Sequence, residues 1–259
     1  MSSAAHLRPS EAFIIPGVRL RVLPRGVSIT LVEPKGPVNV GHVARLVQNF
    51  GVGKLYLVNP KVELSVASIY ASHATEVLDR AVVTNFERVR RENEMLVATT
   101  AVRATKKSNV IRRMVRTERL HEILGSAQTS SIVFGRDSTG LTNEEIRMCD
   151  ATVTIDTAST YRSLNLGHAV AIVLYLASRG GVRKGRSQGR MAREVFAKSF
   201  YELAEAARIP EHKTRNFYEA GKRVAATSEM TDVQLNMLSG VFRKAATSIR
   251  EPQARGSNT

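Results

Sequence analysis

The sequence predicts an α/β fold, with a parallel sheet that carries helices on both faces, followed by a small all-helical extension. Between residues 27 and 179, short β-branched segments alternate with stretches of helical periodicity, which is typical of parallel sheets covered on both faces. After a glycine-rich basic segment, the remaining sequence shows helical periodicity alone. We therefore expect an N-terminal arm (1–26), an α/β domain (27–179), a basic flexible linker (180–190) and a helical C-terminal domain (191–259).

Five strands are expected in the α/β domain, because short β-branched or apolar segments recur between turn residues. They cover 27–32, 54–58, 95–99, 131–134 and 151–155. Apolar residues at helical spacing predict one helix over 39–50, which Asn39 could cap and Gly51 could end, and another over 165–178. Thr142 and Glu145 have the spacing of a capping box, which predicts a short helix running to about Cys149.

Three amphipathic stretches predict the helices of the C-terminal domain, over 191–207, 213–226 and 231–249. Thr231 and Gln234 form a second capping box in front of the last helix. From Glu194 onward the chain has ten basic and eight acidic residues, so this part is close to neutral, although a basic segment precedes it. The domain could hold a polyanion, join two copies of the chain, or do both.

The charge of the whole chain is strongly positive, with 38 Lys and Arg against 23 Asp and Glu, a net charge of +15. The excess is concentrated in two segments: 103–121 holds seven basic residues and one acid, and 179–193 holds six basic residues and no acid. Clustered positive charge indicates a nucleic-acid partner. The plainer interpretation, a solvated basic face, stays open for any single residue.

Several classes of protein find no support in the sequence. Cys149 is the only cysteine, which excludes an internal disulfide and fits a reducing, cytoplasmic environment. No apolar run reaches the roughly 18 residues that span a bilayer, so we expect no membrane segment. The six histidines are scattered and form no metal-binding pattern with cysteine, and no glycine-rich nucleotide loop follows a strand. We therefore expect no metal.

Three motifs each follow a predicted strand and lead into a predicted helix, which is where parallel sheets place their ligands. The first is Glu33-Pro-Lys-Gly-Pro-Val-Asn-Val-Gly-His-Val-Ala-Arg45. The second is Ile132-Val-Phe-Gly-Arg-Asp-Ser-Thr-Gly-Leu-Thr-Asn-Glu-Glu145. The third is Tyr161-Arg-Ser-Leu-Asn-Leu-Gly-His-Ala-Val-Ala171.

In this order, the three motifs resemble those of the SPOUT, or trefoil-knotted, methyltransferases that make 2′-O-methylribose in tRNA and rRNA. The resemblance covers about 27–179. Leu57-Val-Asn-Pro60, Phe134-Gly-Arg136 and Gly140-Leu-Thr-Asn-Glu-Glu145 are most similar to the subfamily that methylates the first residue of the tRNA anticodon loop, a cytidine or uridine. The resemblance implies a deep C-terminal trefoil knot, a homodimer, S-adenosylmethionine as cofactor and tRNA as substrate. An rRNA methyltransferase of the same superfamily and a non-catalytic RNA-binding protein are the alternatives.

By motif position, the resemblance also implies the residues of the site. The cofactor would be held at Thr99, Thr100, Ala101, Gly135, Ile155, Arg162, Ser163 and Leu164. Arg45, Asn39, Ser163 and Asn165 would be catalytic. The basic residues expected to contact RNA are Arg103, Lys106, Lys107, Arg112, Arg113, Arg136, Arg183, Lys184 and Arg186.

The proposed catalytic arginine, Arg45, allows two roles. It could accept the proton of the ribose 2′-hydroxyl, although a guanidinium is a poor base in isolation because its pKa is above about 12. It could instead hold an RNA phosphate and orient the hydroxyl, which we favour, with Asn39 fixing Arg45 or the ribose. Gly135 would let the backbone approach the cofactor. Glu144 or Glu145 could anchor the second motif or only cap its helix.

The sequence departs from the subfamily pattern at two positions. Asp137 stands where the subfamily usually has glutamate, one methylene longer, and His73 stands where a glycine is expected. The first departure puts the geometry of the second motif in question.

Overall fold

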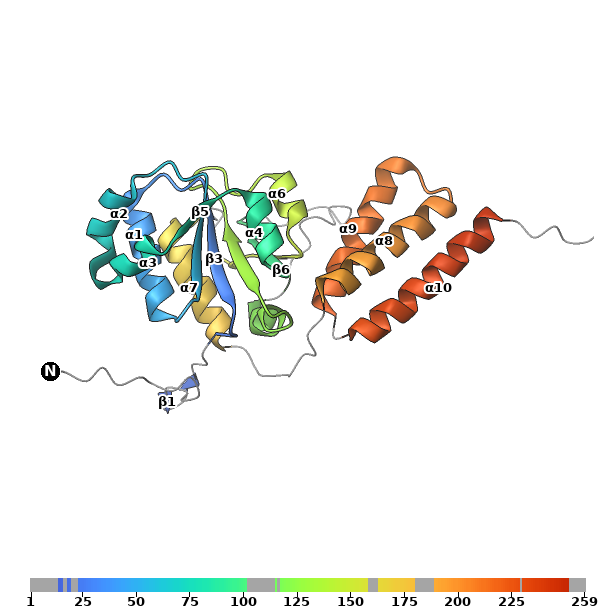
Figure 1. Cartoon of the computed structure of the whole chain (residues 1–259), viewed down its shortest axis with the longest axis horizontal. Helices are drawn as coiled ribbons and strands as arrows, with labels where there is room; N and C mark the ends of the chain where they lie inside the picture. The colour runs from blue at the N-terminus through green and yellow to red at the C-terminus, as the bar shows by residue number, and fades with distance from the viewer. Residues whose placement is uncertain are drawn as a thin grey trace, which may run out of the picture.

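The structure, a computed structural model, describes residues 23–101, 115, 117–157, 163–179, 189–228 and 230–251, with two short strands, Ile14–Ile15 (β1) and Val18–Arg19 (β2). Figure 1 shows an α/β body and, beside it, three long helices, α8 to α10. Leu23, assigned to the arm by the sequence, is buried in the core of the α/β body.

Six parallel strands form the central sheet, in the order β5-β4-β3-β7-β6-β8. They are β3 (Val27–Val32), β4 (Lys54–Val58), β5 (Val82–Thr84), β6 (Met95–Thr99), β7 (Ser130–Phe134) and β8 (Ala151–Val153). Ala98 pairs with Val133, and Thr99 pairs with Val153, so the chain leaves β6, β7 and β8 at the same edge of the sheet. This edge collects the segments that carry the motifs.

Helices cover both faces of the sheet, as the sequence predicts. On one face α1 (Pro37–Asn49), α5 (Leu120–Leu124) and α7 (Leu166–Arg179) bury their apolar residues, with α2 (Leu64–Ala71) and α3 (Thr75–Asp79) packed beside α1. On the other face α4 (Phe86–Glu92) and α6 (Asn143–Met148) contribute Val89 and Ile146 to a second apolar cluster. Short 3-10 turns at Ser72–Ala74 and Thr117–Arg119 complete the body.

The structure differs from the sequence analysis in three local details. The first helix begins at Pro37 and has Gly36 at its cap, so Asn39 lies inside the first turn; proline at the first position carries the dihedral angle that a helix needs. The strand expected over 151–155 ends at Val153, and Thr154 instead donates its hydroxyl to the carbonyl of Thr100. No element was predicted between 61 and 94, where β5 has only three residues and two of the helices are short.

The extension consists of α8 (Arg190–Ala206), α9 (Glu211–Thr227) and α10 (Asp232–Arg250), close to the predicted ranges. Both predicted capping boxes are present, at Thr142 with Glu145 and at Thr231 with Gln234. Phe196, Phe200 and Phe242 stack between α8 and α10 with ring centroids 5.5 to 6.3 Å apart. Aromatic packing of this kind stabilises a small helical core.

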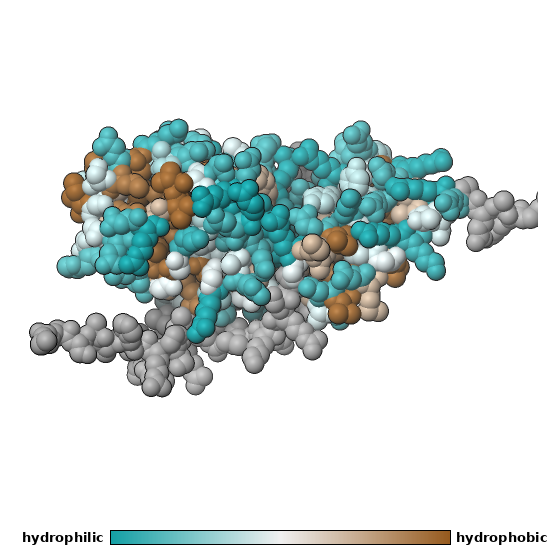
Figure 2. Space-filling view, viewed as in Figure 1, coloured by the Kyte–Doolittle hydropathy of each residue, from teal (hydrophilic) through white to brown (hydrophobic). Residues whose placement is uncertain are grey.

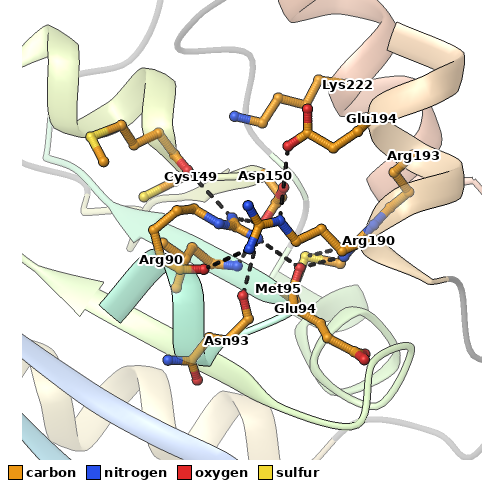
Figure 3. A network of polar contacts seen from close by, with 12 residues as sticks. Arg90, Asn93, Glu94, Met95, Cys149, Asp150, Arg190, Arg193, Glu194 and Lys222 are labelled. Atoms are coloured by element: carbon orange, nitrogen blue, oxygen red, sulfur yellow. Dashed lines mark hydrogen bonds and ion pairs between the residues drawn. The ribbon is translucent and has the colours of Figure 1, made fainter. Parts of the chain in front are cut away.

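Buried charges join the extension to the α/β body (Figure 3). Arg193 of α8 is only 2% exposed and donates to the carbonyl of Glu94, while Arg223 of α9 donates to the Thr152 hydroxyl over 2.8 Å. Asp150 accepts hydrogen bonds from Arg90 at 2.5 Å and from the backbone of Leu96 at 2.7 Å. Burial alone would raise the pKa of Asp150, but the positive charges of Arg90, Arg193 and Lys222 hold it below its ordinary value.

Candidate active site

A cavity of about 450 Å³ lies where β6, β7 and β8 end. Its walls come from the three segments that follow these strands and from the start of α7. Seven of the eight expected cofactor residues line it, namely Thr99, Thr100, Ala101, Gly135, Ile155, Ser163 and Leu164. Arg162 lies outside the described residues. The volume falls in the range of about 300–1,000 Å³ that is typical of cofactor sites.

The lining of the cavity is mixed in character. Val153, Ile155, Leu166 and Val173 present apolar surface, while Arg136, Asp137, Ser138 and Thr139 bring polar groups from the loop after β7. An apolar wall suits a nucleoside base, and a polar side suits the charged end of an amino acid. The residues present therefore fit S-adenosylmethionine, which joins an adenosine to a methionine.

Gly135 is required by the loop itself. A Cβ at this position would lie 2.2 Å from the carbonyl carbon of Gly140 and 2.3 Å from the amide nitrogen of Leu141. Arg136 and Gly140 exchange two backbone hydrogen bonds, of 3.2 and 2.9 Å, and Gly140 has a positive φ of 68°. The sequence suggested that a glycine stands here so that a ligand can approach the backbone. The structure adds a second requirement, because the turn leaves no room for a side chain at Gly135.

Arg136 anchors the loop to two acidic residues. Its guanidinium donates to both carboxylate oxygens of Glu145 at 3.0 Å and to Glu33 at 2.7 Å. The hydrogen bonds that Arg136 donates to these carboxylates raise its pKa, and Arg136 in turn lowers the pKa of Glu33. Its predicted contact with RNA stays a prediction, but here its side chain is 19% exposed and already held by two carboxylates.

Of the two glutamates of the second motif, Glu145 both caps α6 and binds Arg136. Glu144, whose side chain is 78% exposed, instead pairs with Arg147. The sequence left open whether a glutamate anchors the loop or caps the helix, and Glu145 does both.

Asn39, Asp137 and Asn165 form a chain of hydrogen bonds beside the cavity. Asn39 donates from Nδ2 to Oδ1 of Asp137 at 2.9 Å and accepts at Oδ1 from Nδ2 of Asn165, also at 2.9 Å. Asn165 in turn accepts from the backbone amides of Gly167 and His168, which caps α7. The structure therefore brings the first and third motifs together through side chains. It also gives a role to Asp137, which the sequence showed only as a departure from the subfamily pattern.

Arg45 is exposed on α1 and does not belong to the lining of the cavity. Six residues along a helix correspond to a rotation of about 240°, so Asn39 and Arg45 point to different sides of α1. Asn39 was expected to fix Arg45 or the ribose; its amide bonds Asp137 and Asn165 here, and its contact with the ribose stays a prediction. Ser163 lines the cavity.

Most residues of the predicted RNA set lie outside the described residues. These are Arg103, Lys106, Lys107, Arg112, Arg113, Arg183, Lys184 and Arg186. The path through 158–162 is also outside them, so the trefoil knot stays a prediction. Across the part of the chain that the structure describes, no helix combines the length and apolarity needed to cross a membrane. In the same part, no cluster of three or more His, Cys, Asp or Glu residues could hold a metal ion.

Comparison with known proteins shows which family the chain belongs to. The model of the SpoU rRNA methylase family matches residues 26–175, which include the sheet, all three motifs and the walls of the cavity. The chain belongs to the SpoU rRNA methylase family. The predicted family resemblance and the predicted α/β fold are thereby confirmed, and the knot itself stays a prediction.

Two similar proteins are both named tRNA (cytidine-2′-O-)-methyltransferase TrmJ. The one from Methanocaldococcus jannaschii is 35% identical over 196 residues, which are 72% of this chain and 85% of that protein. The one from Sulfolobus acidocaldarius is 35% identical over 151 residues, but the match spans 58% of this chain and only 63% of that protein. The crystal structure of TrmJ from Z. mobilis ZM4 has the same fold, with a TM-score of 0.60 at 23% identity, covering 86% of this chain and 98% of that one.

Proposed function

We propose that this chain is an S-adenosylmethionine-dependent tRNA methyltransferase that modifies a ribose 2′-hydroxyl, at the first residue of the anticodon loop. The observation that carries the proposal is the cavity at the ends of β6, β7 and β8, lined by seven of the eight residues that the motifs assign to the cofactor. The names of the relatives, which are tRNA 2′-O-methyltransferases, support tRNA as the substrate.

S-adenosylmethionine would supply a methyl group on a sulfonium centre. The backbone at Thr99, Thr100 and Ala101 and the apolar side chains of Ile155 and Leu164 would hold its adenosine. Asp137 lines the polar side, and its carboxylate favours a cationic ligand there. The cap at Asn165 and the turn at Gly135 keep the walls in place, so that binding orients the methyl group without rearrangement.

On the RNA side, the protein has to place the 2′-hydroxyl in line with the methyl group and ease the loss of its proton. Asn39, Ser163 and Asn165 lie at or beside the cavity and would position the ribose. Arg45 would hold the neighbouring phosphate, since a guanidinium matches phosphate oxygens and stays charged. The proton would then leave to phosphate or water.

The active form would be a homodimer. Val38 of α1, Val66, Ile69 and Tyr70 of α2, and Ile172 and Tyr175 of α7 are exposed, with Ile69 at 75%. Figure 2 shows apolar side chains gathered over the part of the molecule that contains α1 and α2. Exposed apolar patches of this kind are typical of protein interfaces. A second copy packed there would bury the patch and bring Arg45, on the exposed side of α1, close to the subunit boundary.

The experiment that tests the function is methyl transfer from labelled S-adenosylmethionine to unmodified tRNA transcripts and to rRNA fragments, followed by nucleoside mass spectrometry. We expect a 2′-O-methylcytidine or 2′-O-methyluridine from the tRNA anticodon loop. Methylation of rRNA alone would replace tRNA by rRNA as the substrate. Absence of cofactor binding in a titration would contradict the enzymatic function and favour a non-catalytic RNA-binding protein.

A further inference from the structure

A groove of about 380 Å³ lies at the junction between the α/β body and the helical extension, away from the cofactor cavity. Five basic side chains line it: Arg90 of α4, Arg147 of α6, Arg190 of α8, and Arg215 and Lys222 of α9. They come from four helices that are distant in sequence, so only the docked extension creates this concentration of charge. Figure 3 shows Arg90, Arg190 and Lys222 meeting at this junction.

The positive charge of the groove is only partly neutralised. Arg90 forms an ion pair with the buried Asp150 and contributes little to the excess. Lys222 is 8% exposed, and its ammonium donates to the backbone carbonyl of Arg147 at 2.6 Å, an acceptor that carries no net charge. Arg215 is exposed at the rim of the groove. A nearly buried ammonium in a basic groove favours an anionic ligand.

Two acidic side chains also line the groove, and each forms an ion pair with one of its arginines. Glu144 is 78% exposed and reaches Arg147 at 3.0 Å, so solvent screens this pair. Glu194 accepts a hydrogen bond from the Tyr218 hydroxyl at 3.0 Å, and its nitrogen–oxygen distance to Arg190 is 4.0 Å. The single charge of Asp150 is shared among Arg90, Arg193 and Lys222 and compensates only one of them, so four basic charges of the groove remain against two acidic ones.

We propose that this junction groove binds phosphate groups of the RNA substrate. The inference rests on the proposed function, because it takes RNA as the ligand. Helix α6 links the groove to the cofactor cavity: the loop before it lines the cavity, and Arg147 near its end lines the groove. Six helical residues span about 9 Å, so one RNA strand can reach both sites. The extension therefore holds the substrate together with the α/β body.

Direct binding of a tRNA transcript to the full-length protein, measured over a range of salt concentrations, tests the groove without using catalysis. Arg215→Ala and Arg147→Ala remove charges whose side chains support no buried contact described above. We expect each to weaken binding about fivefold and to reduce the slope of log K against log salt by roughly one. Lys244→Ala, an exposed lysine of α10 outside the groove, is the matched control and should leave both values unchanged.

Glu144→Gln removes a negative charge from the groove, whereas the two arginine variants remove positive charges. Removing this negative charge should tighten tRNA binding about twofold to fivefold, a gain that a folding defect cannot produce. Cofactor titration should give the same affinity for all these variants. If Arg215→Ala and Arg147→Ala bind tRNA as tightly as the unaltered chain, with the same salt slope, the groove holds no phosphate and the proposal is overturned.

Methyl-transfer and binding assays together distinguish a failure of the phosphate site from a failure of the proposed enzymatic function. If the unaltered chain methylates no RNA but binds tRNA with the expected dependence on Arg147, Arg215 and Glu144, the enzymatic proposal fails and the phosphate site stands. If methyl transfer to tRNA occurs while these variants bind normally, the enzymatic proposal stands and the phosphate site fails.

Discussion

Asn39 and Asp137 lie 98 positions apart in the sequence, yet Nδ2 of the asparagine donates to Oδ1 of the aspartate over 2.9 Å. Because Asp137 uses the amide nitrogen, the amide oxygen of Asn39 faces Asn165, and the orientation of the asparagine is fixed at both ends. The shorter aspartate thus reaches Asn39 and closes the second motif onto the first.

Asp137→Ala should therefore impair catalysis more than folding. Without its acceptor the Asn39 amide can rotate, and we expect kcat for methyl transfer to fall about tenfold or more. Thermal unfolding should change little, since this hydrogen bond is exposed. Asp137→Asn keeps an oxygen acceptor and should retain most of the activity. Equal losses in both variants would mean that the charge of Asp137, rather than its hydrogen bond, is what matters.

Arg45→Ala should reduce the rate of methyl transfer by about a hundredfold or more. This is expected for a residue that acts on the ribose 2′-hydroxyl or holds the neighbouring RNA phosphate. Cofactor affinity, measured by titration calorimetry, should stay within twofold, because Arg45 does not line the cavity. Gln48→Ala, an exposed position one turn further along α1, is the matched control. Near-normal turnover of Arg45→Ala would refute the proposed role.

Gly135→Ala should disrupt the loop after β7. The added methyl would lie 2.2 Å from the Gly140 carbonyl carbon, so the turn has to open, at a cost of about 1–3 kcal/mol in the free energy of unfolding. Cofactor affinity should fall with it, since the loop forms a wall of the cavity. At Gly53, a Cβ would be 3.5 Å from the nearest atom, so Gly53→Ala is a suitable control. An unchanged melting temperature for Gly135→Ala would contradict the packing described above.

Asp150→Asn should destabilise the junction between the two parts of the chain. It leaves Arg90 and the neighbouring Arg193 without the carboxylate that compensates their burial, and we expect a loss of about 3–5 kcal/mol in urea unfolding. Glu76→Gln breaks the exposed pair with Arg80 and should leave the midpoint unchanged.

The effect of Asp150→Asn should depend on pH with a defined sign. The pKa of Asp150 is lower in the folded protein than its ordinary value of 3.8, so its stabilisation is fully present above about pH 4. It is lost as the pH falls through the folded pKa. The difference in unfolding free energy between the unaltered chain and the variant should therefore be constant near neutrality and shrink in acid. A difference that grew in acid would contradict this assignment.

Ile69→Glu should convert the proposed dimer to a monomer in sedimentation velocity, because it places a charge in the exposed apolar patch on α2. Met191→Glu alters a residue of α8 that is 80% exposed and should leave the dimer intact. Dissociation by Met191→Glu alone would move the interface to the helical extension.

The sequence by itself determined the local features of this protein. Alternating β-branched and helical segments predicted the parallel sheet, because strand and helix periodicities are properties of neighbouring residues. Both capping boxes formed as predicted, since each involves residues only three positions apart. The cofactor residues came from motif positions, and seven of them line one cavity because β6, β7 and β8 end at the same edge of the sheet.

Only the tertiary structure decided which distant side chains meet. Arg193 belongs to a run of basic residues that the sequence suggested for phosphate contacts, yet it is 2% exposed and donates to the carbonyl of Glu94. Asn39 was expected at a helix cap and instead joins Asp137 to Asn165. The junction groove likewise exists only because α9 packs beside α6. Contacts between residues this far apart depend on how whole elements pack, and no local pattern in the chain encodes them.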